Sequence, residues 1–75
     1  MQYKLVDTSG KVVKQIDLPP LDGKVGEQVI TEDDGRTWYL LATGEMTFER
    51  SGVVQEITVG TLSQLDEKRR SQSPG

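Results

Sequence analysis

The sequence repeats one short pattern three times: a β-prone run, a tight turn and a second β-prone run. The turns are at Ser9-Gly10, Asp33-Asp34-Gly35-Arg36 and Ser51-Gly52. The runs that they separate are residues 2–7 and 11–18, 28–32 and 37–42, and 46–50 and 53–59. Each turn places glycine where a hairpin requires a positive φ angle, between runs rich in Val, Ile, Thr and aromatic residues. The pattern predicts three β-hairpins.

Turn length decides which residues face each other in these hairpins. With Ser9-Gly10 as a two-residue loop, Val6 faces Val13 and Tyr3 faces Ile16; a three-residue loop with a bulge at Gly10 would shift this pairing. With Asp34-Gly35 as the second turn, the expected pairs are Thr31 with Trp38, Val29 with Leu40 and Ile30 with Tyr39. With Ser51-Gly52 as the third, they are Arg50 with Val53, Phe48 with Gln55 and Met46 with Ile57. Thr47 and Val54 then fall on the opposite, solvated face of the third hairpin.

Residues 37–42 are apolar on both faces, and a strand of this kind is normally covered on both sides. We read Thr43-Gly44-Glu45 as a second tight connection, which separates this strand from the third hairpin. The expected fold class is all-β: a small SH3-like barrel, or a rolled antiparallel sheet, of five or six strands. The alternative is an open antiparallel sheet that pairs with another copy of the chain.

The composition changes after Gly60. Thr61 and Gln64 have the spacing of a capping box, and Leu62 and Leu65 share one helical stripe, which predicts a short helix at about 62–70. The helix either docks through these two leucines or frays, because it is too short to persist alone. The expected organisation is one domain at 1–60, a helix or ordered extension at 61–70 and a disordered tail at 71–75.

The residue inventory argues against an enzyme. The 75 residues include no histidine and no cysteine, so the usual general base and the usual thiol nucleophile are missing. No serine-nucleophile motif or glycine-rich phosphate loop occurs. The acids Glu27, Glu32, Asp33 and Asp34 lack the spacing of a calcium loop, and we interpret them as solvated charges around a turn. We therefore expect no catalytic residues, metal site or cofactor.

The adjacent aromatic residues Trp38 and Tyr39 point to a binding role. Neighbouring strand residues project to opposite faces, so one small core cannot hold both rings. We expect one of the two to lie at an interface or in solvent, with Arg36 beside it and Leu41 following on the strand. The sequence thus predicts a protein-binding module or small assembly subunit that acts through an apolar β-hairpin surface. The partner is a second protein or another copy of the chain.

Two alternatives remain open. One is a single-stranded nucleic-acid-binding barrel with an aromatic platform and the bases Lys4, Lys11, Lys14 and Arg36. The net charge of −3 disfavours it, because phosphate binding depends on clustered Lys and Arg. The other is an acidic protein that mimics nucleic acid and inhibits a nucleic-acid-binding protein. No run approaches the roughly 20 apolar residues of a membrane span, and we expect a cytoplasmic location.

Overall fold

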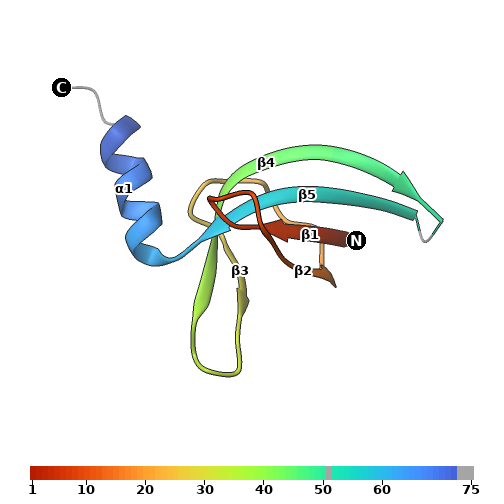
Figure 1. Ribbon diagram of the computed structural model, residues 1–75, viewed down its shortest axis with the longest axis horizontal. Helices are drawn as coiled ribbons and strands as arrows, with labels where there is room; N and C mark the ends of the chain where they lie inside the picture. Colours follow the sequence, from red (N-terminus) through yellow and green to blue (C-terminus); the bar gives the residue numbers. More distant parts are fainter. Residues whose placement is uncertain (51, 73–75) are drawn as a thin grey trace.

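The computed structural model, described here for residues 1–50 and 52–72, contains a five-stranded sheet and one helix (Figure 1). The elements are β1 (Gln2–Val6), β2 (Val12–Asp17), β3 (Gln28–Thr31), β4 (Thr37–Glu49), β5 (Gly52–Gly60) and α1 (Leu62–Gln72). The sheet curls into a half-barrel and α1 follows its last strand. This confirms the predicted β-rich fold with a C-terminal helix. No helix among the described residues is both long and apolar enough to cross a membrane.

The first and last strands of the chain lie side by side inside the sheet, whose strand order is β2-β1-β5-β4-β3. β1 and β5 are parallel, with Gln2 beside Val54 and Val6 beside Thr58, whereas the other three neighbouring pairs are antiparallel. The prediction of a wholly antiparallel sheet is therefore wrong for this pair. The contact joins segments about fifty residues apart in the sequence, and turn spacing does not determine such a pairing.

The first two hairpins share one turn geometry, a three-residue loop that ends in a left-handed glycine. In the first, the amide of Asp7 donates to the carbonyl of Lys11 at 2.9 Å and Gly10 donates to Asp7 at 3.0 Å. In the second, Glu32 donates to Arg36 at 2.7 Å and Gly35 donates to Glu32 at 2.9 Å. Gly10 and Gly35 both have a φ angle of 89°, which only glycine adopts without strain.

These longer loops change the register that two-residue turns predicted. In the first hairpin Tyr3 pairs with Ile16 as expected, but Val6 pairs with Val12 rather than Val13. In the second, Ile30 pairs with Trp38 rather than Tyr39. Thr31 pairs with Thr37 rather than Trp38, and the two hydroxyls lie 3.1 Å apart. The added loop residue shifts the pairs next to each turn, and in the first hairpin a bulge between Leu5 and Val6 restores the expected register farther from the turn.

β4 runs without a break through Thr43-Gly44-Glu45, so the tight connection predicted there is wrong. A register shift between Thr43 and Met46 absorbs the irregular residues as a bulge. Beyond it, Phe48 pairs with Val53 and Met46 pairs with Gln55, two residues away from the predicted partners. A shift of two preserves the face of every side chain. Ser51, in the predicted third turn, lies outside the described residues.

The core lies on one face of the sheet and contains six buried side chains: Tyr3, Leu5, Trp38, Leu40, Ile57 and Val59. The partly buried side chains that pack against it are Val13, Ile16, Leu18, Leu21, Val29 and Ile30. Val13 therefore faces this core, not the opposite face that the predicted register implied. Val54, predicted to be solvated, is also buried. It lies on the central strand, with Gln2 and Thr47 directly beside it on the flanking strands.

α1 begins with the predicted capping box. The amide of Thr61 donates to Oε1 of Gln64 at 2.9 Å, and the amide of Gln64 donates to Oγ1 of Thr61 at 3.3 Å. Leu65 is buried and docks the helix, whereas Leu62 is exposed, so the prediction of docking through Leu62 is wrong. Nε2 of Gln64 also donates to Oγ1 of Thr8 at 3.2 Å, which ties α1 to the first hairpin turn.

Candidate functional site

The four residues predicted to bind a partner lie on two different faces of β4 and its turn. Trp38 is in the core, with 9% of its surface exposed, and the guanidinium carbon of Arg36 lies 6.0 Å from the centre of its indole ring. Leu41 is buried on the opposite face, beneath α1, and Tyr39 is half-buried. Strand alternation therefore separates the two aromatic residues as predicted. The four residues do not form one continuous surface.

Hydrogen bonds hold the Trp38 side of this hairpin in place. Nε1 of Trp38 donates to Oε1 of Glu32 at 3.2 Å, and Nζ of Lys14 donates to Oε2 of the same carboxylate at 2.9 Å. The bond from Lys14 and the weaker one from Trp38 hold the pKa of Glu32 below its usual value. A shallow depression of about 380 Å³ opens beside Glu32, Arg36 and Trp38. These contacts serve the structure of the hairpin.

The acidic residues around the second turn accept hydrogen bonds at separate places and do not form one cluster. Glu27 accepts hydrogen bonds from the amides of Asp22 and Gly23, each 3.1 Å long, and so shapes the loop before β3. Oδ1 of Asp34 accepts a bond from the amide of Arg36 at 2.9 Å within the turn. Over residues 1–50 and 52–72, no three carboxylates lie close enough together to hold a metal ion.

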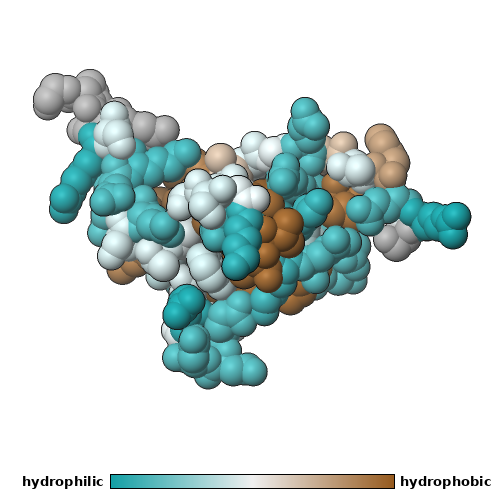
Figure 2. Space-filling view, viewed as in Figure 1, coloured by the Kyte–Doolittle hydropathy of each residue, from teal (hydrophilic) through white to brown (hydrophobic). Residues whose placement is uncertain are grey.

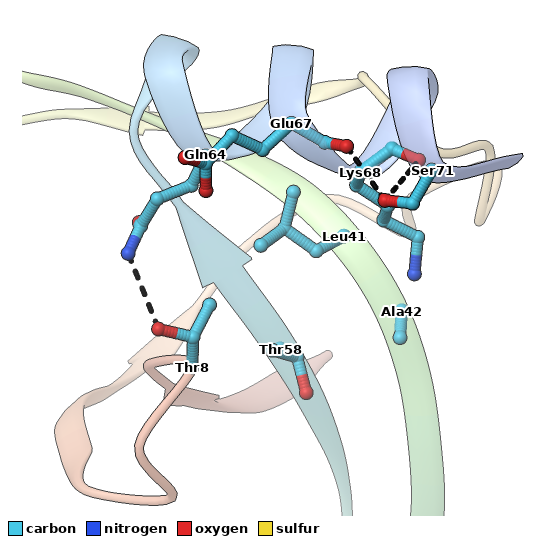
Figure 3. Close-up of a pocket in the computed structure, with 8 residues that line it drawn as sticks. All are labelled: Thr8, Leu41, Ala42, Thr58, Gln64, Glu67, Lys68 and Ser71. Atoms are coloured by element: carbon cyan, nitrogen blue, oxygen red, sulfur yellow. Dashed lines mark hydrogen bonds between the residues drawn. The ribbon is translucent and has the colours of Figure 1, made fainter.

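A cleft of about 440 Å³ lies between α1 and the outer face of the sheet (Figure 3). We call it the α1 cleft. Leu41 and Ala42 of β4 and Thr58 of β5 line its sheet side. Its helix side is lined by Gln64, Glu67, Lys68 and Ser71, and Thr8 closes one end. An apolar floor with a polar and charged rim is typical of a site that accepts an apolar group in a fixed orientation.

The far ends of β4 and β5 form an arm, residues 44–49 and 52–56, that extends from the body of the protein (Figure 1). β1 pairs with residues 54–56 of this arm, so only its tip is two-stranded. Phe48 on this arm is 84% exposed and Met46 is 56% exposed. Because Phe48 pairs with Val53 and Met46 pairs with Gln55, these side chains lie on the same face as Ile57 of the core. The apolar face of the core therefore continues onto the arm, where hydrophobic surface is exposed (Figure 2).

The arm has fewer neighbouring strands than the rest of the sheet. Pairing of β3 with β4 ends at Tyr39, and the next residue, Leu40, exchanges backbone hydrogen bonds with Gly26 and Glu27. On the other side, β1 pairs with β5 only from Val54 onward. Among the described residues, the outer edge of β4 beyond Thr43 has no strand beside it. Such an edge carries free backbone donors and acceptors.

The sequence placed Phe48 and Met46 on the drier face of the third hairpin but did not reveal that this face is uncovered. One signal was available, because Phe48 stands close to the end of its hairpin, where neighbouring strands are least able to cover it. Comparison with protein-family models, with curated proteins and with solved structures found no match to this chain. A functional proposal for this chain must therefore be argued from its own surfaces, of which the arm and the α1 cleft are the most distinctive.

Proposed function

We propose that the chain is a non-enzymatic protein-binding module or a small assembly subunit, and that it binds through the apolar face of the β4–β5 arm. The observation that supports this proposal is the 84% exposure of Phe48, next to Met46 and on the face that continues from the core. A contiguous exposed apolar surface on a folded domain is typical of an interaction site. Within such surfaces, aromatic residues commonly supply much of the binding energy.

The chemistry of the arm suits a protein partner. Full burial of a Phe side chain contributes about 1.5–3 kcal/mol, and the free edge of β4 can pair with an extended segment through backbone hydrogen bonds. In this proposal Phe48 replaces Trp38 as the aromatic anchor, because the indole of Trp38 is committed to the core. The SH3-like character of the fold and the cytoplasmic location stay predictions.

A protein partner is favoured over single-stranded nucleic acid by the charges near the exposed ring. The arm carries Glu45, Glu49 and Glu56, and the one base next to it at its tip is Arg50. Lys14, one of the bases that a nucleic-acid platform would need, is already paired with Glu32. A nucleic acid would need clustered Lys and Arg near the aromatic platform to neutralise its phosphates.

A photoreactive side chain at position 48 tests this proposal in cells that express the protein. A matched control carries the same group at Val25, an exposed apolar residue of the loop before β3. We expect covalent protein adducts from position 48 and few or none from position 25. Adducts to nucleic acid from position 48 would instead support the alternative. Equal yields at the two positions would overturn the proposal, since the arm would then be no more engaged than an ordinary surface loop.

A further inference from the structure

We infer that the partner of the arm is an extended protein segment that pairs with the uncovered edge of β4, with apolar side chains on one of its faces and basic side chains on the other. The inference rests on the proposed function, because it names the chemistry of the partner that the arm binds. Residues 44–49 of β4 would then lie between β5 and the bound segment, which becomes a further strand of the sheet.

The uncovered edge of β4 calls for an extended partner. Over residues 1–50 and 52–72, the last backbone groups that hydrogen-bond to this side of β4 are those of Gly26 and Glu27, at Leu40. Residues 44–49 pair only with β5, and β4 is the outermost strand of the arm (Figure 1). An extended chain can bond to such an edge. A helix cannot, because its backbone groups are already bonded to each other.

The two faces of this edge strand differ in polarity. Met46 and Phe48 project to the face that holds Ile57 of the core. Glu45 and Glu49 project to the opposite face, and both are exposed. Neither carboxylate makes an ion pair with another residue that the structure describes. A strand added at this edge therefore meets apolar side chains on one face and carboxylates on the other.

The bases near the arm do not neutralise these two carboxylates. Lys4 on β1 lies beside Glu56 on β5, and β5 separates it from β4. Arg50 follows Glu49 at the tip of the arm, and within the described part of the chain it makes no ion pair. Because Glu45 and Glu49 are on the edge strand itself, they determine the charge that an added strand must carry.

These positions define a short sequence pattern in the partner. Residues opposite Glu45 and Glu49 should be Lys or Arg. Residues opposite Met46 and Phe48 should be apolar, and the position opposite Thr47 is less restricted. The pattern is thus basic, apolar, any residue, apolar, basic, and it is the same in both chain directions. Cross-strand pairs of opposite charge and pairs of apolar side chains both stabilise neighbouring strands.

A second copy of the chain fits this edge less well. When two arms pair with both Phe48 rings on one face, Glu45 and Glu49 of both copies gather on the other face, where like charges repel. β2, the strand at the other side of the sheet, carries Gln15 and Asp17 on its outer face and no base there. The charges therefore favour a segment of a different protein.

Binding of labelled synthetic peptides, followed by fluorescence anisotropy, tests the pattern. The alternating peptide has Lys-Val-Thr-Val-Lys between flexible Gly-Ser ends. The scrambled peptide has the same residues in the order Lys-Lys-Thr-Val-Val, which puts one base and one valine on each face. We expect the alternating peptide to bind about tenfold more tightly or better. Equal affinities, or no measurable binding of either peptide, would overturn the inference.

Exchange of the charges gives a readout that misfolding does not imitate. The wild type should bind the alternating lysine peptide about fivefold more tightly than Glu-Val-Thr-Val-Glu. A chain with both Glu45→Lys and Glu49→Lys should reverse this preference, and an unchanged preference would overturn the inference. Phe48→Ser should weaken binding of the lysine peptide about tenfold or more. The matched control Val25→Ser, at an exposed apolar residue of the loop before β3, should leave it unchanged.

N-methyl groups on the alternating peptide test whether its backbone pairs with β4. Successive backbone amides of an extended chain point to opposite edges, so only alternate amides can face β4. One isomer is methylated at both valines, and the other at the threonine and the second lysine. We expect one isomer to lose binding and the other to keep it. Equal behaviour of the two isomers would overturn pairing at the edge.

The photoreactive group at position 48 separates this inference from the proposed function. Adducts to a different protein, combined with no preference among the peptides, would overturn the inference and leave the proposed function standing. Adducts only between two copies of the chain would overturn the inference in favour of self-association. Absence of both adducts and peptide binding would overturn both.

Discussion

The two halves of β4 carry one aromatic residue each on the core face of the sheet, and these residues have opposite environments. Trp38 in the first half is 9% exposed, and Phe48 in the second half is 84% exposed. The first half has β3 beside it and the loop before β3 across its face, with Leu21, Val29 and Ile30 packed against the core. The second half has only β5 beside it over the length of the arm.

This difference shows that burial along one strand is decided by what the rest of the chain places over it. The apolar side chains of both halves have similar β propensity, and such propensity largely reflects packing against neighbours. An uncovered apolar half adds little to folding, and an exposed apolar surface of this kind is what the proposed binding role requires. The stability of the chain should therefore depend on the first half, and association should depend on the second.

The largest expected effect is at Trp38. Trp38→Ala removes a large core side chain and leaves Glu32 without its indole donor, so we expect the free energy of unfolding to fall by about 3–5 kcal/mol. Urea unfolding followed by far-ultraviolet circular dichroism measures this, since the variant lacks the tryptophan signal. Trp38→Phe should cost clearly less. A loss from Trp38→Ala no larger than a typical surface substitution would contradict the contrast between the two halves.

A substitution in the turn between β3 and β4 should lower the free energy of unfolding by a smaller amount. Gly35 has a φ angle of 89°, and a Cβ atom added there would meet no atom within 4 Å. The expected cost of Gly35→Ala is therefore a backbone cost alone, about 1 kcal/mol. Gly10→Ala is the matched control, because Gly10 has the same φ angle, equally open surroundings and the same turn geometry. Clearly unequal losses in thermal unfolding would show that the two turns are not equivalent.

The carboxylate of Glu32 makes the stability of the first half depend on pH. Its pKa is held below the usual value by the hydrogen bond from Lys14, assisted by Trp38. A lowered pKa in the folded state means that the unfolded state binds the proton more readily. The stabilisation is thus fully present above about pH 4.3, the usual pKa of a glutamate, and is lost as the pH falls through the folded value.

Glu32→Gln tests this dependence. The thermal midpoint of the variant should lie below that of the wild type at neutral pH, and the difference should shrink as the pH falls below about 4.3. Glu45→Gln on the arm is the control, because Glu45 is exposed and has no hydrogen bond or ion pair among the described contacts. A difference for Glu32→Gln that is constant across this range would show that the ion pair with Lys14 does not stabilise the fold.

The sequence determines much of the local structure of this protein. The capping box at Thr61 and Gln64, the three hairpins and the alternation that separates Trp38 from Tyr39 all follow from short-range patterns, and the structure contains each of them. The loop lengths were wrong in the first two hairpins because a Gly after two polar residues suits both a two-residue and a three-residue turn.

The functional surfaces were harder to predict because they depend on contacts between distant segments. The parallel pairing of β1 with β5 leaves Gly52 and Val53 beyond the reach of β1, and this leaves the tip of the arm two-stranded. The α1 cleft exists because Leu65, rather than Leu62, docks the helix against the sheet. Neither the β1–β5 pairing nor the docking of α1 leaves a periodic signal in the sequence. Strand alternation could therefore assign Phe48 to a face of the sheet, but it could not show that this face is uncovered.

The smallest expected effect is at Phe48 itself. Phe48→Lys replaces a side chain that is already 84% exposed, so the free energy of unfolding of the monomer should change by no more than about 0.5 kcal/mol. The measurement uses the chain without a partner, because a bound segment would add to the apparent stability of the wild type. The gap between wild type and variant should therefore widen when the alternating lysine peptide is added. A loss above about 1 kcal/mol without peptide would mean that the ring packs within its own chain, and the arm would then belong to the fold rather than to an interface.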